Sequence, residues 1–340
     1  MRLRQLKAEA LGRLGRLDGS PAHSGKERPR LPILVYHRIL PEAEWPHDLD
    51  TDLVSATPEA FERQMAFVAG HFTPVTFRQL ANHCLGEEPL PDNPIIITLD
   101  DGYRDSYRYA FPILKRHGLR ACFFVITGLV ESGGIPWWDE VARYVKGTPK
   151  QTLTLTPWLK DPLRLGDGHS RITAVRDCLR AVKLLPNKER LAFLETLRVA
   201  SGVAHSNGHH PSLLCGWGEL GEMAQAGMEI GSHSATHPVL SHLETPEEIR
   251  REIEGSKAAI EAALGVPVQA FSYAGLHTPA LEDAVRAAGY RFAVHFVEGA
   301  NLFPLRNPWR LHRLRVEADV SLNEFKAMLV HPWCQPELVE

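Results

Sequence analysis

Short apolar runs alternate with helical segments along this sequence, and that alternation limits its fold more than any other feature. Residues 95–99 (IIITL) form a β-branched run that stops at a DDG triplet, as a buried parallel strand does. A helical stretch at 106–117 follows, and residues 121–126 (ACFFVI) form the next buried run. Strand, helix and strand in this order make a βαβ unit, which is typical of α/β proteins.

The same alternation recurs over most of the chain. Further strands are expected at 32–40, 228–231, 268–273, 291–296 and 311–316. Helices are expected at 58–69, 219–226, 246–264, 279–288 and 322–330. Residues 141–202 differ, because they hold helical stretches at 171–185 and 188–199 and no convincing strand. The pattern predicts an α/β barrel or a doubly wound sheet, interrupted by a helical insertion.

Composition excludes several classes of protein. The 340 residues are 44% hydrophobic and 23% charged, which is ordinary for a globular chain of one large domain or two smaller ones. Lys and Arg number 38 against 41 Asp and Glu, so the chain lacks the basic surface that nucleic-acid binding needs. Five cysteines without CxxC spacing argue against a disulfide framework and favour a reducing compartment. We therefore predict a cytoplasmic protein with no nucleic-acid partner.

Residues 1–20 carry a basic amphipathic pattern. Leu3, Leu6, Ala10, Leu14 and Leu17 recur at helical spacing, with arginines and a lysine between them. Charges interrupt this stretch, so it does not read as a signal peptide, and no apolar run reaches the roughly 20 residues of a membrane span. Two interpretations stay open: peripheral contact with an anionic membrane, or a helix packed on the domain or left as a frayed arm. We expect an arm and linker at 1–30 and one domain at 31–340.

Titratable side chains follow four of the expected strands at the same end. They are His37, the pair Asp100 and Asp101, His233 with His237, and Tyr273. The carboxyl ends of parallel strands meet at one face, where catalytic groups gather. A DDG triplet alone is most often a turn, and an HxxxH loop alone is most often structural. Together they predict a site for one divalent metal built from two imidazoles and a carboxylate, with Zn²⁺ expected first and Co²⁺, Ni²⁺ or Mn²⁺ as alternatives. Because Pro238 disfavours helix at the residue before it, we expect the two histidines in a tight loop.

The two motifs resemble those of a known family. Residues 98–102 (TLDDG) resemble the TFDDG motif of the polysaccharide deacetylases, the NodB-homology or carbohydrate esterase 4 family, and residues 233–237 (HSATH) resemble its H-S/T-x-x-H motif. The order of segments also follows the family, except for the helical insertion at about 141–215. The VYHRI opening and the PWWD segment resemble a cytosolic branch associated with surface-polysaccharide assembly. The resemblance implies a distorted (β/α)7 barrel with a helical insertion.

The resemblance also implies an activity. It indicates a metal-dependent hydrolase that removes N-acetyl groups from an amino sugar in a polysaccharide, oligosaccharide or lipid-linked glycan. Asp101, His233 and His237 match the family's metal ligands, and Asp100 matches its general base. Water activated by the metal would attack the amide carbonyl, and a backbone N–H near Tyr273 would help to hold the oxyanion. The products would be a free amino sugar and acetate.

Departures from the family leave the catalytic acid open. The proline that usually follows the tyrosine of the third motif is absent after Tyr273, so we expect a less rigid loop there. The last strand places His312 and Arg313 where family members often carry a catalytic histidine. Only one of the two faces the site if the strand alternates. The resemblance to the cytosolic branch favours Arg313 facing inward, where it could pair with Asp100, with His312 as the alternative acid. His37 is either another proton donor or a residue with a structural hydrogen bond below the barrel mouth.

A second group of residues is expected at the substrate. Trp137, Trp138 and Asp139 lie in an expected loop after the 121–126 strand, and Tyr103 follows the DDG triplet. Indole faces can stack on sugar rings. The alternative is that the tryptophans pack the helical insertion onto the barrel.

Three other functions stay open. Two histidines and a carboxylate also make the facial triad of non-haem iron oxygenases, although those sites usually lie on all-β scaffolds. A deformylase or amidase acting on a small sugar amide would use the same groups, and a degenerate barrel would bind a glycan without catalysis. A GxGxxG match at 216–221 lacks a convincing preceding strand and a ribose-binding acid, so it is interpreted as a turn before a helix.

Overall fold

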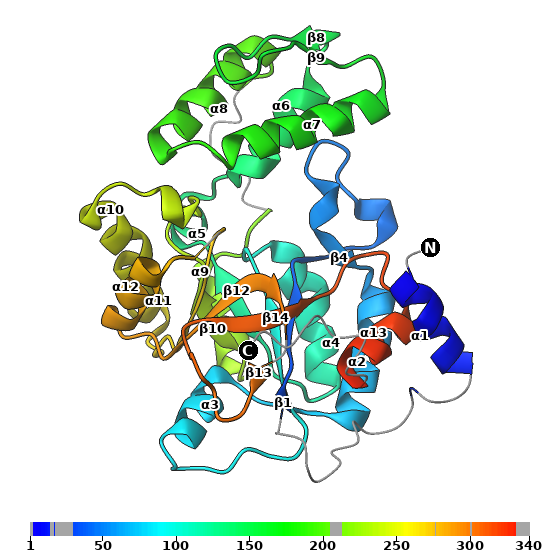
Figure 1. Cartoon of the computed structure of the whole chain (residues 1–340), viewed down its shortest axis with the longest axis vertical. Helices are drawn as coiled ribbons and strands as arrows, with labels where there is room; N and C mark the ends of the chain where they lie inside the picture. Colours follow the sequence, from blue (N-terminus) through cyan, green and yellow to red (C-terminus); the bar gives the residue numbers. More distant parts are fainter. Residues whose placement is uncertain are drawn as a thin grey trace.

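Seven parallel strands close into a barrel in this computed structural model, which describes residues 3–13, 17, 30–204, 213–275, 277–299 and 301–330 (Figure 1). In spatial order the barrel strands are β2 (Ile33–Tyr36), β14 (Leu311–Arg315), β12 (Phe292–Glu298), β11 (Ala270–Ser272), β10 (Glu229–Ser232), β7 (Cys122–Val125) and β6 (Pro94–Leu99). Pairing of β2 with β6 closes the ring, and the short β5 (Thr73–Pro74) pairs with β6 outside it. The expected (β/α)7 barrel is confirmed, and closure of the ring excludes a doubly wound open sheet.

Helices cover the outside of the barrel. They are α2 (Pro58–His71), α4 (Phe111–Arg116), α9 (Trp217–Gln225), α10 (Pro246–Arg250), α11 (Ser256–Leu264), α12 (Pro279–Ala287) and α13 (Leu322–Val330). Their apolar faces bury the outward side chains of the strands in one continuous core. Two of the expected helices are interrupted by π-helical turns, η3 (Ser106–Ala110) before α4 and η5 (Arg251–Gly255) between α10 and α11.

Helix α3 (Phe77–Cys84), which the sequence pattern did not predict, covers the amino end of the barrel. Its Phe77 ring packs against Phe124 and Phe292 in the barrel interior. Glu229, the first residue of β10, accepts hydrogen bonds from the N–H groups of Phe77 (2.6 Å) and Arg78 (2.8 Å) and so caps the helix. This end is filled, which leaves the carboxyl ends of the strands for a site.

The helical insertion forms a lobe with its own apolar core, above the barrel in Figure 1. It contains α6 (Trp137–Gly147), α7 (Gly168–Val182) and α8 (Asn187–Ser201), reached from β7 through α5 (Thr127–Ser132). The expectation of no strand there was wrong, since β8 (Thr152–Leu153) pairs antiparallel with β9 (Leu163–Arg164). These strands are only two residues long, which is too short for a recognisable alternation in the sequence.

Helix α1 (Leu3–Arg13) packs on α13 at the side of the barrel (Figure 1). Ala8 and Leu11 are buried there, and so is Leu17 after the helix, whereas Leu6 is 47% exposed and Ala10 is exposed, so the stripe expected from spacing is only partly buried. The packing partner decides the buried face, and peripheral membrane contact through residues 1–20 stays a prediction. Most of the expected linker lies outside the described residues. None of the helices in the described ranges has the length and apolar character needed to cross a bilayer.

Candidate metal and catalytic site

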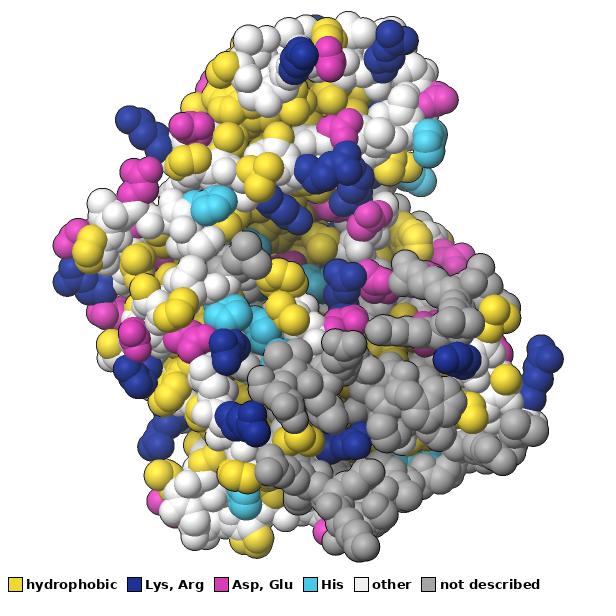
Figure 2. All heavy atoms as spheres, viewed as in Figure 1, with side chains coloured by type: hydrophobic (Ala, Val, Ile, Leu, Met, Phe, Trp, Pro, Cys, Tyr) yellow, Lys and Arg dark blue, Asp and Glu magenta, His cyan; other side chains and the backbone are white. Residues whose placement is uncertain are grey.

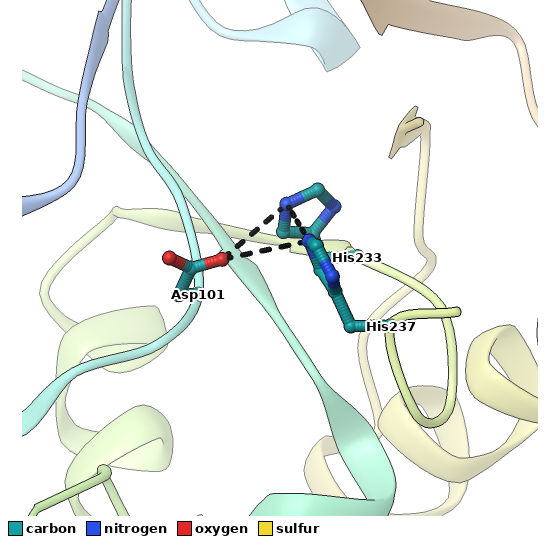
Figure 3. A group of neighbouring side chains, drawn as sticks. All are labelled: Asp101, His233 and His237. Atoms are coloured by element: carbon teal, nitrogen blue, oxygen red, sulfur yellow. Dashed lines mark hydrogen bonds and ion pairs between the residues drawn. The ribbon is translucent and has the colours of Figure 1, made fainter. Parts of the chain in front are cut away.

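Asp101, His233 and His237 converge at the carboxyl ends of β6 and β10 (Figure 3). The Nε2 atoms of the two histidines lie 3.2 Å apart, and Asp101 Oδ1 lies 3.5 Å from His233 Nε2 and 3.9 Å from His237 Nε2. Three ligands about 2.0–2.1 Å from one zinc ion at tetrahedral angles would lie about 3.3 Å from each other. The spacing of the three atoms therefore fits a divalent metal.

The protonation of these groups supports the same conclusion. His233 Nδ1 donates a hydrogen bond to the backbone oxygen of Ser272 (2.8 Å), which directs the Nε2 lone pair of the neutral ring at the cluster. Burial lowers the pKa of both histidines, and the neighbouring His233 adds to the shift of His237, so both rings are neutral at neutral pH. Burial, with the nearby charges of Asp100 and Asp139, raises the pKa of Asp101 well above its usual range. A buried carboxylate that faces two lone pairs is costly unless a cation lies between them.

Two of the three candidate ligands, and one residue of the loop between the histidines, have strained backbone. Asp101 has φ 72°, Ser234 φ 66° and His237 φ 54°, all in the left-handed region that residues other than glycine rarely adopt. As expected from the proline after it, His237 lies in a loop and not in a helix. Ser234 Oγ accepts the His237 N–H (3.0 Å) and closes this loop. Strain of this kind persists where surrounding contacts over-determine the backbone, often at functional sites.

Asp100 lies beside the cluster and is paired with Arg313. The guanidinium donates from Nη1 to Oδ1 and from Nη2 to Oδ2, each at 2.8 Å, and Ser272 Oγ donates to Oδ2 at 3.3 Å. Burial alone would raise the pKa of Asp100, but the charges of Arg313 and His233 and the paired hydrogen bonds outweigh burial and hold it well below its usual range. Asp100 is therefore ionised, with Oδ2 only 3.6 Å from His233 Nε2.

The structure separates the two candidate proton donors. His37 follows β2 and continues the row of its inward-facing side chains. Burial lowers the pKa of His37 to about 4, although the negative charge of Asp100 acts to raise it. His312 lies on the other face of β14, with its ring 4.6 Å from the ring of His295 and its Nδ1 3.4 Å from the Val297 oxygen. Of the two, His37 is the one whose ring senses the charge of Asp100.

Tyr273 is buried, and its polar groups are already bonded. Its hydroxyl donates to the Trp309 oxygen and its N–H to the Val294 oxygen, both at 3.0 Å. The Tyr273 N–H is thus unavailable to an oxyanion. The next N–H along, that of Ala274, makes no hydrogen bond within the described part of the chain, and the oxyanion donor expected near Tyr273 stays a prediction.

The aromatic residues form a buried wall behind His237. Tyr103 donates its hydroxyl to Asp139 (2.6 Å) and accepts from Trp138 Nε1 (2.8 Å), and Trp137 Nε1 donates to the His237 oxygen (3.0 Å). The Trp138 ring meets the His237 ring edge-on at 4.6 Å. Burial raises the pKa of Asp139 to about 6. The loop expected at Trp137, Trp138 and Asp139 was wrong, since these three residues begin α6. Contact of the aromatic residues with substrate stays a prediction.

Ser272 and Glu252 are two site residues that sequence reasoning did not single out. Ser272 ends β11 at the same end as the other polar groups, so strand position was a signal for it. Glu252 lies in η5 and contacts the loop between the two histidines, a contact that no spacing in the sequence indicates.

Figure 2 shows the surface hollowed between the helical lobe and the barrel, with hydrophobic, basic and histidine side chains gathered there.

Comparison with known proteins finds similarity to one family. The sequence model of the family described as Polysaccharide deacetylase matches residues 87–149 and 191–293. The putative polysaccharide deacetylase YxkH of Bacillus subtilis (strain 168) is 30% identical over 111 residues, 32% of this chain and 37% of that one. The poly-beta-1,6-N-acetyl-D-glucosamine N-deacetylase of Escherichia coli (strain K12) is 29% identical over 92 residues, 23% of this chain and 14% of that one. The chain thus spans well under half the length of both relatives.

Solved structures agree with the fold. A Streptococcus pyogenes deacetylase, PplD in complex with acetate, superposes with a TM-score of 0.59 at 19% identity, covering 90% of this chain and 100% of that one. The polysaccharide deacetylase BC0361 from Bacillus cereus gives 0.57 at 18% identity, covering 89% and 69%. The family model and the named relatives thus make residues 87–149 and 191–293 similar to polysaccharide deacetylases, and the solved structures show that the chain shares their fold.

Proposed function

We propose that this chain is a divalent-metal-dependent carbohydrate N-deacetylase. Its substrate would be an N-acetylated amino sugar in a polysaccharide, an oligosaccharide or a lipid-linked glycan, and its products the free amine and acetate. The observation that carries the proposal is the ionised Asp100, held by Arg313, beside the Asp101, His233 and His237 cluster. The name of the Escherichia coli relative supports a polymer of N-acetylglucosamine as the first substrate class.

The site residues divide the work of amide hydrolysis. A divalent metal held by Asp101, His233 and His237, with Zn²⁺ expected first, would polarise the acetamide carbonyl and lower the pKa of a water molecule. Asp100 is ionised at neutral pH and accepts the proton that the attacking water loses. Arg313 donates one hydrogen bond to each carboxylate oxygen of Asp100 and so fixes the orientation of the base.

Two further groups complete the proposal. The free N–H of Ala274, next to Ser272 and Tyr273 at the end of β11, is placed to donate to the developing oxyanion. His37 is neutral at neutral pH and is proposed to pass the proton that Asp100 takes from the attacking water to the leaving amine, because it lies on the inner side of the barrel mouth near Asp100. Collapse of the tetrahedral intermediate then releases the amine and acetate.

The cellular location is proposed from thiol chemistry. Cys84, Cys122, Cys178 and Cys215 are free cysteines, as is usual where thiols are kept reduced. We therefore place the protein in the cytoplasm. Resistance of the native fold to reductant, together with full labelling of these thiols after denaturation without reductant, would agree with this location.

Acetate release over a substrate panel tests the proposed activity. The panel holds oligomers and polymers of N-acetylglucosamine and lipid-linked N-acetylhexosamine, each assayed with protein that has been metal-loaded or treated with chelator. We expect acetate from at least one substrate, its loss with chelator and its return with Zn²⁺ or Co²⁺. Release of formate alone would indicate a deformylase, and turnover that consumes oxygen would indicate an oxygenase. No release from any substrate would favour a glycan-binding barrel.

A further inference from the structure

The loop that joins the two histidines is held from outside on three sides. On the first side, the N–H groups that begin α5 donate to the loop: Thr127 N–H bonds the Ser234 oxygen (3.3 Å) and Gly128 N–H the Ala235 oxygen (2.8 Å). A side chain at position 128 would not fit, because its Cβ would lie 2.8 Å from the Ala235 oxygen. The loop is therefore pressed closely against the start of α5.

Glu252 forms the second side. Its Oε2 accepts the N–H groups of Ala235 (3.0 Å) and Thr236 (2.8 Å), and its Oε1 accepts the Thr236 hydroxyl (2.7 Å). Glu252 as a whole is only 3% exposed, so these hydrogen bonds are shielded from water. Hydrogen bonds to an ionised acceptor are about twice as strong as bonds between neutral groups. One side chain thus fixes both residues in the middle of the loop.

The third side comes from the helical insertion. Trp137, the first residue of α6, donates its indole N–H to the His237 oxygen (3.0 Å). Arg190 of α8 is buried, with its guanidinium carbon 5.7 Å from the centroid of the Trp137 ring, and it interacts electrostatically with Glu252. Arg190 therefore links the second and third sides of the loop.

These contacts explain how the strained loop persists. Ser234 and His237 both have positive φ, a conformation that needs support from the surrounding structure. Glu252 holds the two residues between them, and Trp137 holds the backbone oxygen of His237. Inside the loop, Ser234 Oγ accepts the His237 N–H. The result is that His237 Nε2 lies 3.2 Å from His233 Nε2, close to the spacing that zinc ligands need.

We propose that Glu252 is a positioning residue of the metal site: it holds the 234–237 loop so that His237 is in place before the metal binds. Trp137 completes the clamp from the insertion. The inference rests on the proposed metal site and adds to it a residue that touches neither metal nor substrate. It also gives the helical insertion a role, since α6 and α8 supply one side of the clamp.

The test compares Glu252→Ala with Glu252→Gln. Alanine removes all three hydrogen bonds. Glutamine can keep them, because its carbonyl oxygen can accept both N–H groups while its amide donates to the Thr236 hydroxyl. We measure the dissociation constant of Zn²⁺ for metal-free protein and the visible absorption of the Co²⁺ form, which reports coordination geometry. We expect about 10- to 100-fold weaker binding and an altered spectrum for E252A, and near wild-type values for E252Q.

Glu229 provides a matched control. It is a half-buried carboxylate on the barrel that also accepts two backbone N–H groups, but it lies at the amino end of β10, away from the metal cluster. E229A should lower the melting temperature and leave Zn²⁺ affinity unchanged. If E252A does not fold, Thr236→Val removes one donor to Glu252 and should weaken Zn²⁺ binding several-fold.

The outcomes separate this inference from the proposed function. Folded E252A that binds Zn²⁺ as tightly as wild type would overturn the inference and leave the deacetylase proposal standing, and so would a T236V variant with unchanged affinity. Equal weakening in E229A would also overturn it, because general destabilisation would then explain the loss. A wild-type protein that binds no divalent metal would overturn both proposals. None of these measurements depends on finding the substrate.

Discussion

Arg313 donates two parallel hydrogen bonds of 2.8 Å to the carboxylate of Asp100, and both side chains are almost completely buried. The pair brings a permanent positive charge to within contact of a carboxylate that lies beside the metal ligands. That charge is the main reason why Asp100 stays ionised despite its burial. The fold builds the pair from the end of β6 and the middle of β14, the two strands that pair with β2 on either side.

Replacement of Arg313 should shift the pH dependence of the reaction. Removing the cation raises the pKa of Asp100, so the acidic limb of the kcat/KM profile should move to higher pH in Arg313→Ala. Orientation of the base is lost as well, and we expect kcat to fall by about 100-fold or more. Arg313→Lys restores charge but not the planar fork, so it should recover the pH profile better than the rate. An acidic limb at the wild-type position in R313A would contradict the role assigned to this pair.

The two candidate acids are distinguished by their faces of the barrel. His37 lies on the inner side near Asp100, whereas His312 contacts His295 on the other face of β14. We expect His37→Ala to lower kcat by about 100-fold and His312→Ala to change it little. Steady-state kinetics of both variants at matched metal content measures this. A large loss in H312A with full activity in H37A would reverse the assignment.

The parts of the site that could be predicted from sequence are those that follow directly from a strand. Asp101 and His233 come straight after apolar runs, so their meeting at one end of a barrel follows from topology. Alternation along a strand indicated that only one of His312 and Arg313 faces the site, and the resemblance to the family branch favoured Arg313. The contact of Glu252 with the histidine loop depends instead on how η5 packs, which local spacing does not encode.

Packing also decided the features of the fold that were predicted wrongly. The buried face of α1 is set by α13, more than 300 residues away, and not by the leucine spacing within the helix itself. Trp137 was expected in a loop because a Gly-Gly pair and a proline precede it, yet it begins α6, with Pro136 just before the helix. In both cases tertiary contacts outweighed a local signal.

Metal removal should lower the stability of the fold. A metal that binds only the native state stabilises it by about 2.7 kcal/mol at a free concentration 100 times its dissociation constant. Thermal unfolding with Zn²⁺ and with chelator should therefore give a higher melting temperature for the loaded protein. His233→Ala should abolish this difference, and H312A, which alters a histidine outside the cluster, should keep it. Equal melting temperatures for wild type with and without metal would argue against the site.

Tyr103 tests whether the buried wall contributes to the fold or to substrate binding. Tyr103→Phe removes the hydroxyl that donates to Asp139 and accepts from Trp138, which leaves two buried polar groups without a partner. We expect the free energy of unfolding to fall by about 1–3 kcal/mol, with KM nearly unchanged. Denaturant unfolding and steady-state kinetics give the two quantities. A large rise in KM with unchanged stability would show that this side chain contacts substrate.

Asp100→Asn gives the most direct test of the account. Asparagine is nearly isosteric with Asp100 but cannot accept a proton as a base, and the three metal ligands are left in place. Acetate release and metal content are measured together for wild type and D100N on an N-acetylglucosamine oligomer or polymer. We expect that D100N binds metal as wild type does and releases acetate at least about 100-fold more slowly. Acetate release by metal-loaded D100N at the wild-type rate would contradict it.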